Sequence, residues 1–352
     1  MNINIILDSE YICKKLSTQN GMRDLENLFM IMKKKSNIII IQDKNQKIIN
    51  NIIHQLIQEL KKKDQIELTY AKTFITELAK GTNGYDFISE EVFDDNILDF
   101  VNSLKKKNYP IKIIISDKKI NSDFECCTIE DSGKILDELE NYSSKYTVTN
   151  NKELLEEAEK GKNIMNFSQY KDVLFNTFWC SDKITIVAKE FFDGAFNSDR
   201  PDLQNLNREK YAKGFKFLFD CLKNVQNFTK QKVNIEIITG LKHTKVHEFK
   251  SNQGEKIDEL YKFLNELNDE INFKLKIIKW GAGNEKFVGE GHGRRIYSDY
   301  GGFDTGFMPF EMHEKNRISG EIFHKDTSFH WINKKSYIEW SKIGYILEQR
   351  PQ

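Results

Sequence analysis

Short runs of β-branched residues alternate along the amino half with longer stretches in which apolar residues recur at helical spacing. The runs predict strands at 3–7, 37–42, 65–70 and 111–116, and the longer stretches predict helices at 23–34, 47–62, 71–80 and 91–107. The four isoleucines at 38–41 are typical of a strand whose two faces are both buried. This alternation predicts a doubly wound parallel sheet over 1–131.

The carboxyl half continues the alternation and then becomes rich in strands. Strands are predicted at 183–188, 233–239 and 273–278, helices at 207–224 and 255–270, and further strands at 293–298, 303–308 and 317–324. Between the halves, residues 132–164 are highly charged and predict a helical connector. We therefore expect an α/β protein of two domains, 1–131 and 165–352.

Composition restricts the partners and the compartment. The chain has 53 basic and 53 acidic residues among 352, so no overall field draws it to a polyanion, and any such partner must be held by a local site. The five cysteines are scattered and lack the spacing of a zinc site. The amino terminus does not look like a signal peptide, and no window approaches the ~18 apolar residues of a membrane helix. We expect a cytoplasmic protein with no transmembrane segment.

The most specific chemistry lies between residues 291 and 306. His292 is followed two residues later by Arg294, and Asp299 and Gly306 complete the pattern. Successive side chains of a strand alternate between its faces, so His292 and Arg294 are expected on the same side. An imidazole beside a guanidinium suits a phosphoryl group, because arginine donates from a planar fork and neutral imidazole is a competent nucleophile.

The spacing His-x-Arg-x4-Asp, with Gly306 seven residues further on, resembles the signature of the phospholipase D superfamily. The resemblance covers about residues 165–345 and implies a phospholipase D-like α/β domain. It implies that His292 is the nucleophile, that Arg294 binds the phosphate and that Asp299 supports the site, with no cofactor. Arg295 and Gly306 are further phosphate-binding candidates. A single motif also implies a homodimer that pairs two copies.

A further catalytic candidate is Glu190, which follows the first strand of the carboxyl domain, where the ligand edge of its sheet is expected.

The motif also departs from the family pattern. The family has lysine at the position of Arg294, and serine and asparagine where Phe307 and Phe310 stand. The His-x-Arg form is similar to that of phospholipase D-like domains used for binding, the carboxyl-terminal domains of microtubule-interacting-and-trafficking proteins. Three interpretations stay open: a catalytic phosphodiesterase site, a non-catalytic site for phosphate or nucleic acid, and side chains that only pair within the sheet.

Carboxylates also follow the strands of the amino half. Asp8 and Glu10 come after the first predicted strand, Asp117 comes after the last, and Asp123 lies six residues further on. The carboxyl ends of parallel strands meet at one edge, where such oxygens would bind Mg²⁺ or Mn²⁺ and activate water. The sequence therefore predicts metal ligands at Asp8, Asp117 and Asp123.

The segments Ile6-Leu7-Asp8 and Ile115-Ser116-Asp117 resemble the strand-end motifs of PIN-type ribonuclease domains. The resemblance implies a middle acid, for which Glu77 and Glu91 are candidates. The alternative is an inactive PIN-like or Rossmann-like domain, in which an aspartate after a strand is ordinary turn chemistry.

Both resemblances point to phosphodiesters. We expect a nuclease that acts on nucleic acid or another phosphodiester. Fusions of this kind are associated with prokaryotic conflict systems, so phage defence and a partner protein from a defence operon are further expectations. The alternative function is a non-catalytic sensor or adaptor with a degenerate phospholipase D-like site.

Overall fold

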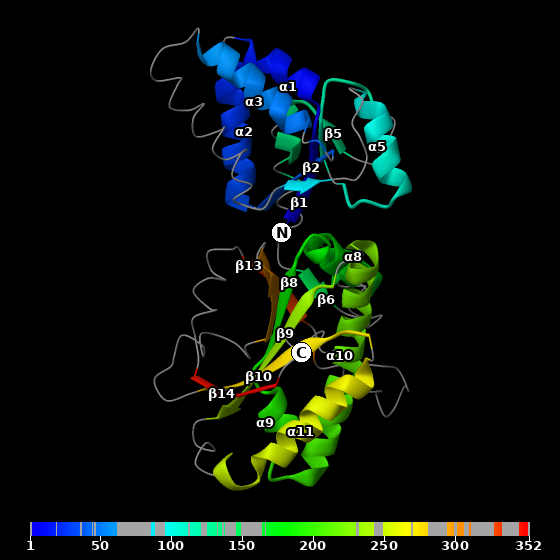
Figure 1. Ribbon diagram of the computed structural model, residues 1–352, viewed down its shortest axis with the longest axis vertical. Helices are drawn as coiled ribbons and strands as arrows, with labels where there is room; N and C mark the ends of the chain where they lie inside the picture. The colour runs from blue at the N-terminus through cyan, green and yellow to red at the C-terminus, as the bar shows by residue number, and fades with distance from the viewer. Residues whose placement is uncertain are drawn as a thin grey trace. The chain divides into compact units, whose positions relative to one another are not determined.

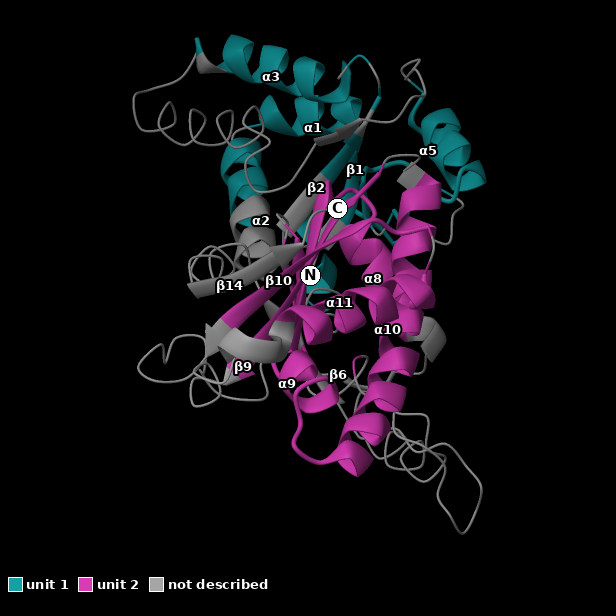
Figure 2. Ribbon diagram, turned by 60° about the horizontal axis from the view of Figure 1, so that its bottom comes forward, with its two compact units in different colours: residues 1–143 teal, residues 144–352 magenta. Residues whose placement is uncertain are grey.

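The computed structural model describes the chain in segments. They are residues 2–18, 20–35, 37–43, 45, 47–61, 86–88, 96–111, 113–120, 125–131, 133–135, 137, 146–148, 164–165, 167–229, 232–242, 249–268, 270–280, 294–298, 301–305, 310, 327–332 and 345–350. The chain divides into two compact units, Met1–Ser143 and Ser144–Gln352, which Figure 2 shows in different colours. One unit is built on a parallel sheet and the other on a mixed sheet, so the predicted α/β class is confirmed.

The described strands of the amino unit form a five-stranded parallel sheet. They are β1 (Asn2–Leu7), β2 (Asn37–Gln42), β3 (Asp86–Ile88), β4 (Ile113–Ile115) and β5 (Glu125–Cys127), in the order β3-β2-β1-β4-β5. After β1 the chain forms β2 and β3 on one side of it, and later forms β4 and β5 on its other side. The carboxyl ends of β1 and β4 therefore flank the point where the strand order reverses, and ligands bind at such a point in doubly wound folds.

Helices cover both faces of this sheet. They are α1 (Ser9–Leu16), α2 (Gly21–Lys35), α3 (Lys47–Leu60) and α5 (Ile97–Lys106), with a short 3₁₀ turn, η1 (Ile129–Asp131). In α3 the apolar residues Ile48, Ile49, Ile52 and Leu56 are buried, as helical spacing predicts, whereas Ile57 is 44% exposed. Figure 1 shows α1, α2 and α3 on one side of the sheet and α5 on the other, which right-handed crossovers in both directions from β1 require.

The described strands of the carboxyl unit form a nine-stranded mixed sheet in the order β14-β10-β9-β8-β11-β12-β13-β6-β7. They are β6 (Tyr146–Val148), β7 (Ile164–Met165), β8 (Lys183–Ala188), β9 (Asn234–Lys242), β10 (Phe273–Trp280), β11 (Arg294–Ser298), β12 (Gly301–Thr305), β13 (Thr327–Ile332) and β14 (Tyr345–Arg350). Strands β8, β9 and β10 are parallel, whereas β11 runs antiparallel to both β8 and β12.

The core of the carboxyl unit lies between one face of this sheet and its helices. These are α8 (Phe167–Phe178), α9 (Phe191–Ala195), α10 (Pro201–Thr229) and α11 (Phe249–Leu267). Figure 1 shows α8, α10 and α11 along the same face. The core is aromatic. Phe191 lies 4.8 Å from Phe215 and 4.5 Å from Tyr211 between ring centroids. Packing of this kind locks α9 and α10 against the end of β8.

Two glycines of the motif region shape the β11–β12 hairpin. Gly301 has a φ of 107°, which L-residues with a side chain rarely adopt. A Cβ on Gly302 would collide with the Ile296 carbonyl oxygen and with Tyr297. These glycines therefore serve the hairpin that holds β11 in place.

Among the described residues the predicted helical connector, 132–164, is helical only at 133–135 and 137. Residues 146–148 form β6, which pairs with β13 and β7 in the second sheet. A three-residue strand obtains its hydrogen bonds from segments distant in sequence, so a local pattern does not reveal it. The predicted strands at 65–70 and 317–324 and the helix at 71–80 lie outside the described residues. No helix among the described segments is long and apolar enough to cross a membrane.

Candidate functional site

The first candidate site lies at the carboxyl end of β8. Strand β8 has β9 on one side and β11 on the other, and the chain reaches β9 first, so the strand order reverses here. The turn after the strand is held by Thr239, whose hydroxyl donates to the Ala188 carbonyl at 2.9 Å and accepts from the Phe192 amide at 2.9 Å. These bonds fix the backbone of Lys189 and Glu190 between β8 and α9.

Arg294 is the first residue of β11 and stands opposite Ala188 in the register. Its side chain is only 2% exposed, and its Nη2 donates to the Tyr211 hydroxyl at 3.4 Å. The same Nη2 lies 3.9 Å from Oε2 of Glu190, whose side chain is 39% exposed. The structure thus brings together two candidates that are far apart in sequence, Arg294 and Glu190.

Two further cations lie beside this pair. Lys189 and Arg295 are each 5% exposed. Burial lowers the pKa of Lys189, Glu190 raises it, and Arg295 and Arg294 lower it further. Burial likewise raises the pKa of Tyr211, and the nearby Arg294 opposes that shift. The three cations therefore lie close enough to influence one another.

Adjacent residues of β11 point to opposite faces of the sheet. Ile296, two residues after Arg294, belongs to the main core under the helices. Tyr297, two residues after Arg295, packs with Val187 and Ile278 on the other face. The cations thus border the end of β8 from both faces. A guanidinium held in a low-dielectric setting is a strong, directional partner for a phosphoryl oxygen.

The remaining candidates of the motif are His292, Asp299 and Gly306, which lie outside the described residues, as does Phe307. Phe310 is fully buried and packs edge-to-face against Phe215, with the ring centroids 6.0 Å apart. It is therefore a core residue.

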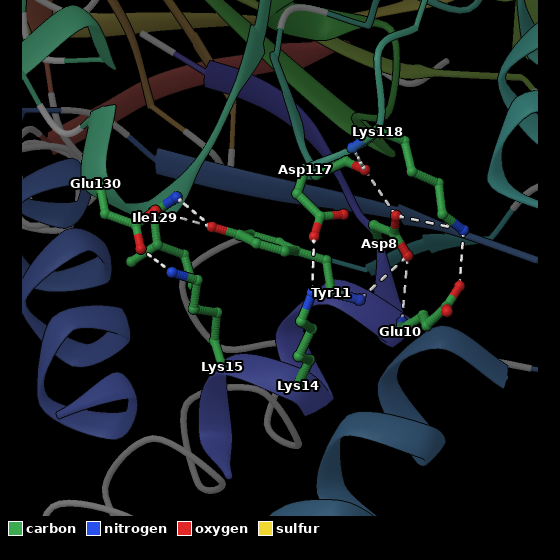
Figure 3. Close-up of polar contacts among 10 residues, drawn as sticks. Asp8, Glu10, Tyr11, Lys14, Lys15, Asp117, Lys118, Ile129 and Glu130 are labelled. Atoms are coloured by element: carbon green, nitrogen blue, oxygen red, sulfur yellow. Dashed lines mark hydrogen bonds and ion pairs between the residues drawn. The ribbon is translucent and has the colours of Figure 1, made fainter. Parts of the chain in front are cut away.

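The second candidate site lies at the carboxyl ends of β1 and β4 (Figure 3). Asp8 is 2% exposed and caps α1, because its Oδ1 accepts from the amides of Glu10 at 3.2 Å and Tyr11 at 3.4 Å. Its Oδ2 accepts from the Ser116 hydroxyl at 2.6 Å. Asp117 follows Ser116, so the predicted aspartates do reach the same edge.

Lysines neutralise the carboxylates of this edge. The Lys118 ammonium donates to Oε2 of Glu10 at 2.7 Å and lies 3.9 Å from Oδ2 of Asp8. The hydrogen bond to Glu10 raises the pKa of Lys118. On α1, Lys14 pairs with Asp117 at 3.5 Å. Figure 3 shows both ammonium groups directed at the carboxylates.

This donor set does not fit a divalent cation. Both oxygens of Asp8 already accept hydrogen bonds, and Glu10 and Asp117 are paired with lysines. Among the described residues no group of three or more His, Cys, Asp or Glu side chains could hold a metal ion. The other expected metal ligand, Asp123, and the middle-acid candidates Glu77 and Glu91 lie outside the described segments.

Sequence reasoning missed several residues of both sites. Asp43 directly follows β2, is fully buried and accepts from the Lys47 amide at 2.7 Å, so the strand-end rule that identified Asp8 would also have found it. Lys118 and Lys189 carried no signal, because isolated lysines are common in this chain.

A second network ties α1 to η1. The Tyr11 hydroxyl accepts from the Ile129 amide at 2.9 Å and donates to Glu130 at 3.1 Å, and Lys15 pairs with Glu130 (Figure 3).

All five cysteines are free. Burial raises the pKa of Cys127 to about 11 and that of Cys221 to about 12, so neither is a thiolate near neutral pH.

In comparisons with known proteins, no family model, no curated protein and no solved structure matches the chain.

Proposed function

We propose that the chain is a phosphodiesterase that acts on nucleic acid, and that its phospholipase D-like carboxyl unit carries the reaction. The supporting observation is the cluster at the end of β8, where buried Arg294 lies beside Glu190, Lys189 and Arg295. Cations held in a low-dielectric setting stabilise the charge that develops on phosphoryl oxygens. The position of the cluster, where the strand order reverses, is that expected of a ligand site.

The proposed reaction uses His292 as nucleophile and Arg294 as the phosphate-binding cation. An imidazole nitrogen attacks phosphorus, a P–N bond forms, and the P–O bond to the leaving alcohol breaks while that oxygen takes a proton. Water then attacks phosphorus and breaks the P–N bond, which releases a phosphomonoester and restores His292. In this proposal Asp299 supports His292 and Gly306 lines the phosphate, while Arg295, on the opposite face of β11 from Arg294, adds positive charge at the strand end. A homodimer would bring a second His292 to donate and accept these protons.

The test is hydrolysis of bis-(p-nitrophenyl) phosphate and of labelled single-stranded and double-stranded oligonucleotides, with and without EDTA. We expect activity that survives EDTA and disappears in His292→Ala. Arg294→Lys, which restores the family pattern, should retain activity, whereas Arg294→Met should lose about 10²-fold or more, as for removal of one preorganised donor. The control is Arg200→Ala, since Arg200 is exposed and pairs with the neighbouring Asp202. Hydrolysis that is unchanged in His292→Ala would refute the proposal.

A second candidate function is a non-catalytic sensor or adaptor that holds a phosphate. One observation favours it: the Arg294 guanidinium is buried and oriented by Tyr211 and Glu190, which suits static bidentate binding. In that case fluorescence anisotropy with a labelled oligonucleotide would show binding that weakens with salt and is lost in Arg294→Met, with no hydrolysis under any condition.

The role in phage defence and the operon partner stay predictions from the sequence.

A further inference from the structure

We propose that the Lys118 ammonium takes, in the amino unit, the place that a divalent cation would hold between Asp8 and Glu10. The edge formed by β1 and β4 then binds neither Mg²⁺ nor Mn²⁺ in the native chain. This inference does not depend on the chemistry proposed for the carboxyl unit.

Both carboxylate oxygens of Asp8 are already used by hydrogen bonds. One oxygen caps α1 through two backbone amides, and the other accepts from the Ser116 hydroxyl and faces Lys118. Mg²⁺ requires close, near-octahedral oxygen ligands at about 2.0–2.1 Å. To reach Asp8 at that distance, an ion would have to displace the ammonium or break a hydrogen bond at a buried helix start.

Lys118 is held in place through both its backbone and its side chain. Its backbone amide donates to the Ser116 hydroxyl at 3.0 Å, and that hydroxyl donates in turn to Asp8. Its ammonium bridges Glu10 and Asp8, with the side chain 37% exposed. The backbone and the ammonium of Lys118 thus close a ring around the same carboxylate, which fixes the position of the charge.

The remaining described carboxylate of the edge, Asp117, is also paired with a lysine. This lysine is Lys14, which stands one turn after Glu10 on α1. Both lysines therefore belong to the elements that would have to supply the metal ligands. An ammonium cannot activate a water molecule as a metal ion does. The edge then joins α1 to the β4 loop instead of performing hydrolysis.

The experiment measures Mn²⁺ binding directly, by loss of the six-line electron paramagnetic resonance signal of free Mn²⁺, with the untagged full-length chain. Lys118→Met removes the charge, and Lys118→Gln is a second variant in case the first does not fold. Lys119→Met is the matched control, because Lys119 is exposed in the same loop. Circular dichroism confirms that each variant is folded.

We expect no saturable Mn²⁺ binding at this edge in the wild type or in Lys119→Met. In Lys118→Met we expect saturable Mn²⁺ binding to appear, because a like charge next to the site is removed. Adding Asp8→Asn to Lys118→Met should abolish that gain. Two results would overturn the inference: wild-type binding that Asp8→Asn removes, or folded Lys118 variants that bind Mn²⁺ no better than Lys119→Met.

Discussion

Replacing Asp8 with alanine removes the acceptor of several hydrogen bonds at the start of α1. The carboxylate accepts hydrogen bonds from the amides of Glu10 and Tyr11 and from the hydroxyl of Ser116. Both Asp8 and Ser116 are buried. The perturbation therefore affects the helix cap and the β1–β4 edge together. We expect it to destabilise the amino unit more than any other single change at this edge.

The size of the effect follows from these contacts. Loss of an N-cap side chain costs about 1 kcal/mol of unfolding free energy. A buried hydroxyl left without its acceptor adds about 1–3 kcal/mol. Asp8→Ala should thus lower the unfolding free energy by about 2–4 kcal/mol. Asp8→Asn keeps an oxygen for the helix amides and should lose roughly half as much. Glu10→Gln should lose less than about 1 kcal/mol, because Glu10 is exposed and its ion pair is solvent-screened.

The assay is urea unfolding followed by far-ultraviolet circular dichroism, combined with amide hydrogen exchange of peptides that cover α1. All four tryptophans lie in the carboxyl unit, so fluorescence alone would not report on the amino unit. Exchange in α1 should accelerate most in Asp8→Ala. If Asp8→Ala unfolds within about 0.5 kcal/mol of the wild type, the reasoning on the cap and on Ser116 is refuted.

Three further predictions concern pH, the hairpin and the thiols. The pKa of Lys118 is raised from 10.5, first by its hydrogen bond to Glu10, so its contribution to stability is fully present below 10.5 and is lost as pH rises through the higher folded value. Urea midpoints of wild type and Lys118→Met should accordingly converge only above that pH. Gly302→Ala should lower the melting temperature of the carboxyl unit, because the added Cβ would collide with Tyr297. Gly254→Ala in α11 should instead raise the unfolding free energy by about 0.5–1 kcal/mol, because the added Cβ would meet no neighbouring atom. A Gly302→Ala melting temperature equal to wild type would contradict the assigned role of the hairpin. Iodoacetamide at pH 8 should modify Cys127 and Cys221 more slowly than an unfolded control, as mass spectrometry can measure, since burial raises the pKa of both.

Local patterns predicted the elements whose stability is local. Strands β2 and β8 have the predicted bounds, because their β-branched runs end at polar residues. Helix α10 begins at Pro201, earlier than the apolar stripe at 207–224 indicates, because proline is favoured in the first turn of a helix. Strands β6 and β14 were missed, since each is defined by pairing with a partner that no local pattern reveals.

In the candidate sites, too, local sequence patterns predicted some residues and missed those that arrive through tertiary packing. The rule that polar residues gather at the carboxyl ends of parallel strands indicated that Asp8 and Asp117 lie at one edge and that Glu190 lies after β8. It did not indicate that Arg294, the first residue of an antiparallel strand, lies beside Glu190. It also could not indicate what neutralises the carboxylates. Lys118 and Tyr211 reach these carboxylates and cations through tertiary packing, and no residue pattern distinguishes them from other lysines and tyrosines of the chain.

The β1–β4 edge and the end of β8 differ in the charges of their described residues. Among the described residues, the β1–β4 edge sets Asp8, Glu10 and Asp117 against two lysines, so a phosphate approaching it would be repelled by the carboxylates. At the end of β8 three buried cations, Lys189, Arg294 and Arg295, lie close together, and Glu190 faces Arg294. A phosphate ligand should therefore bind the carboxyl unit and leave the amino edge unaffected. In one chain that carries both Arg294→Met and Lys118→Met, oligonucleotide binding should fall and Mn²⁺ binding should rise, each to the extent seen in the single variants, because the two charge clusters share no residue.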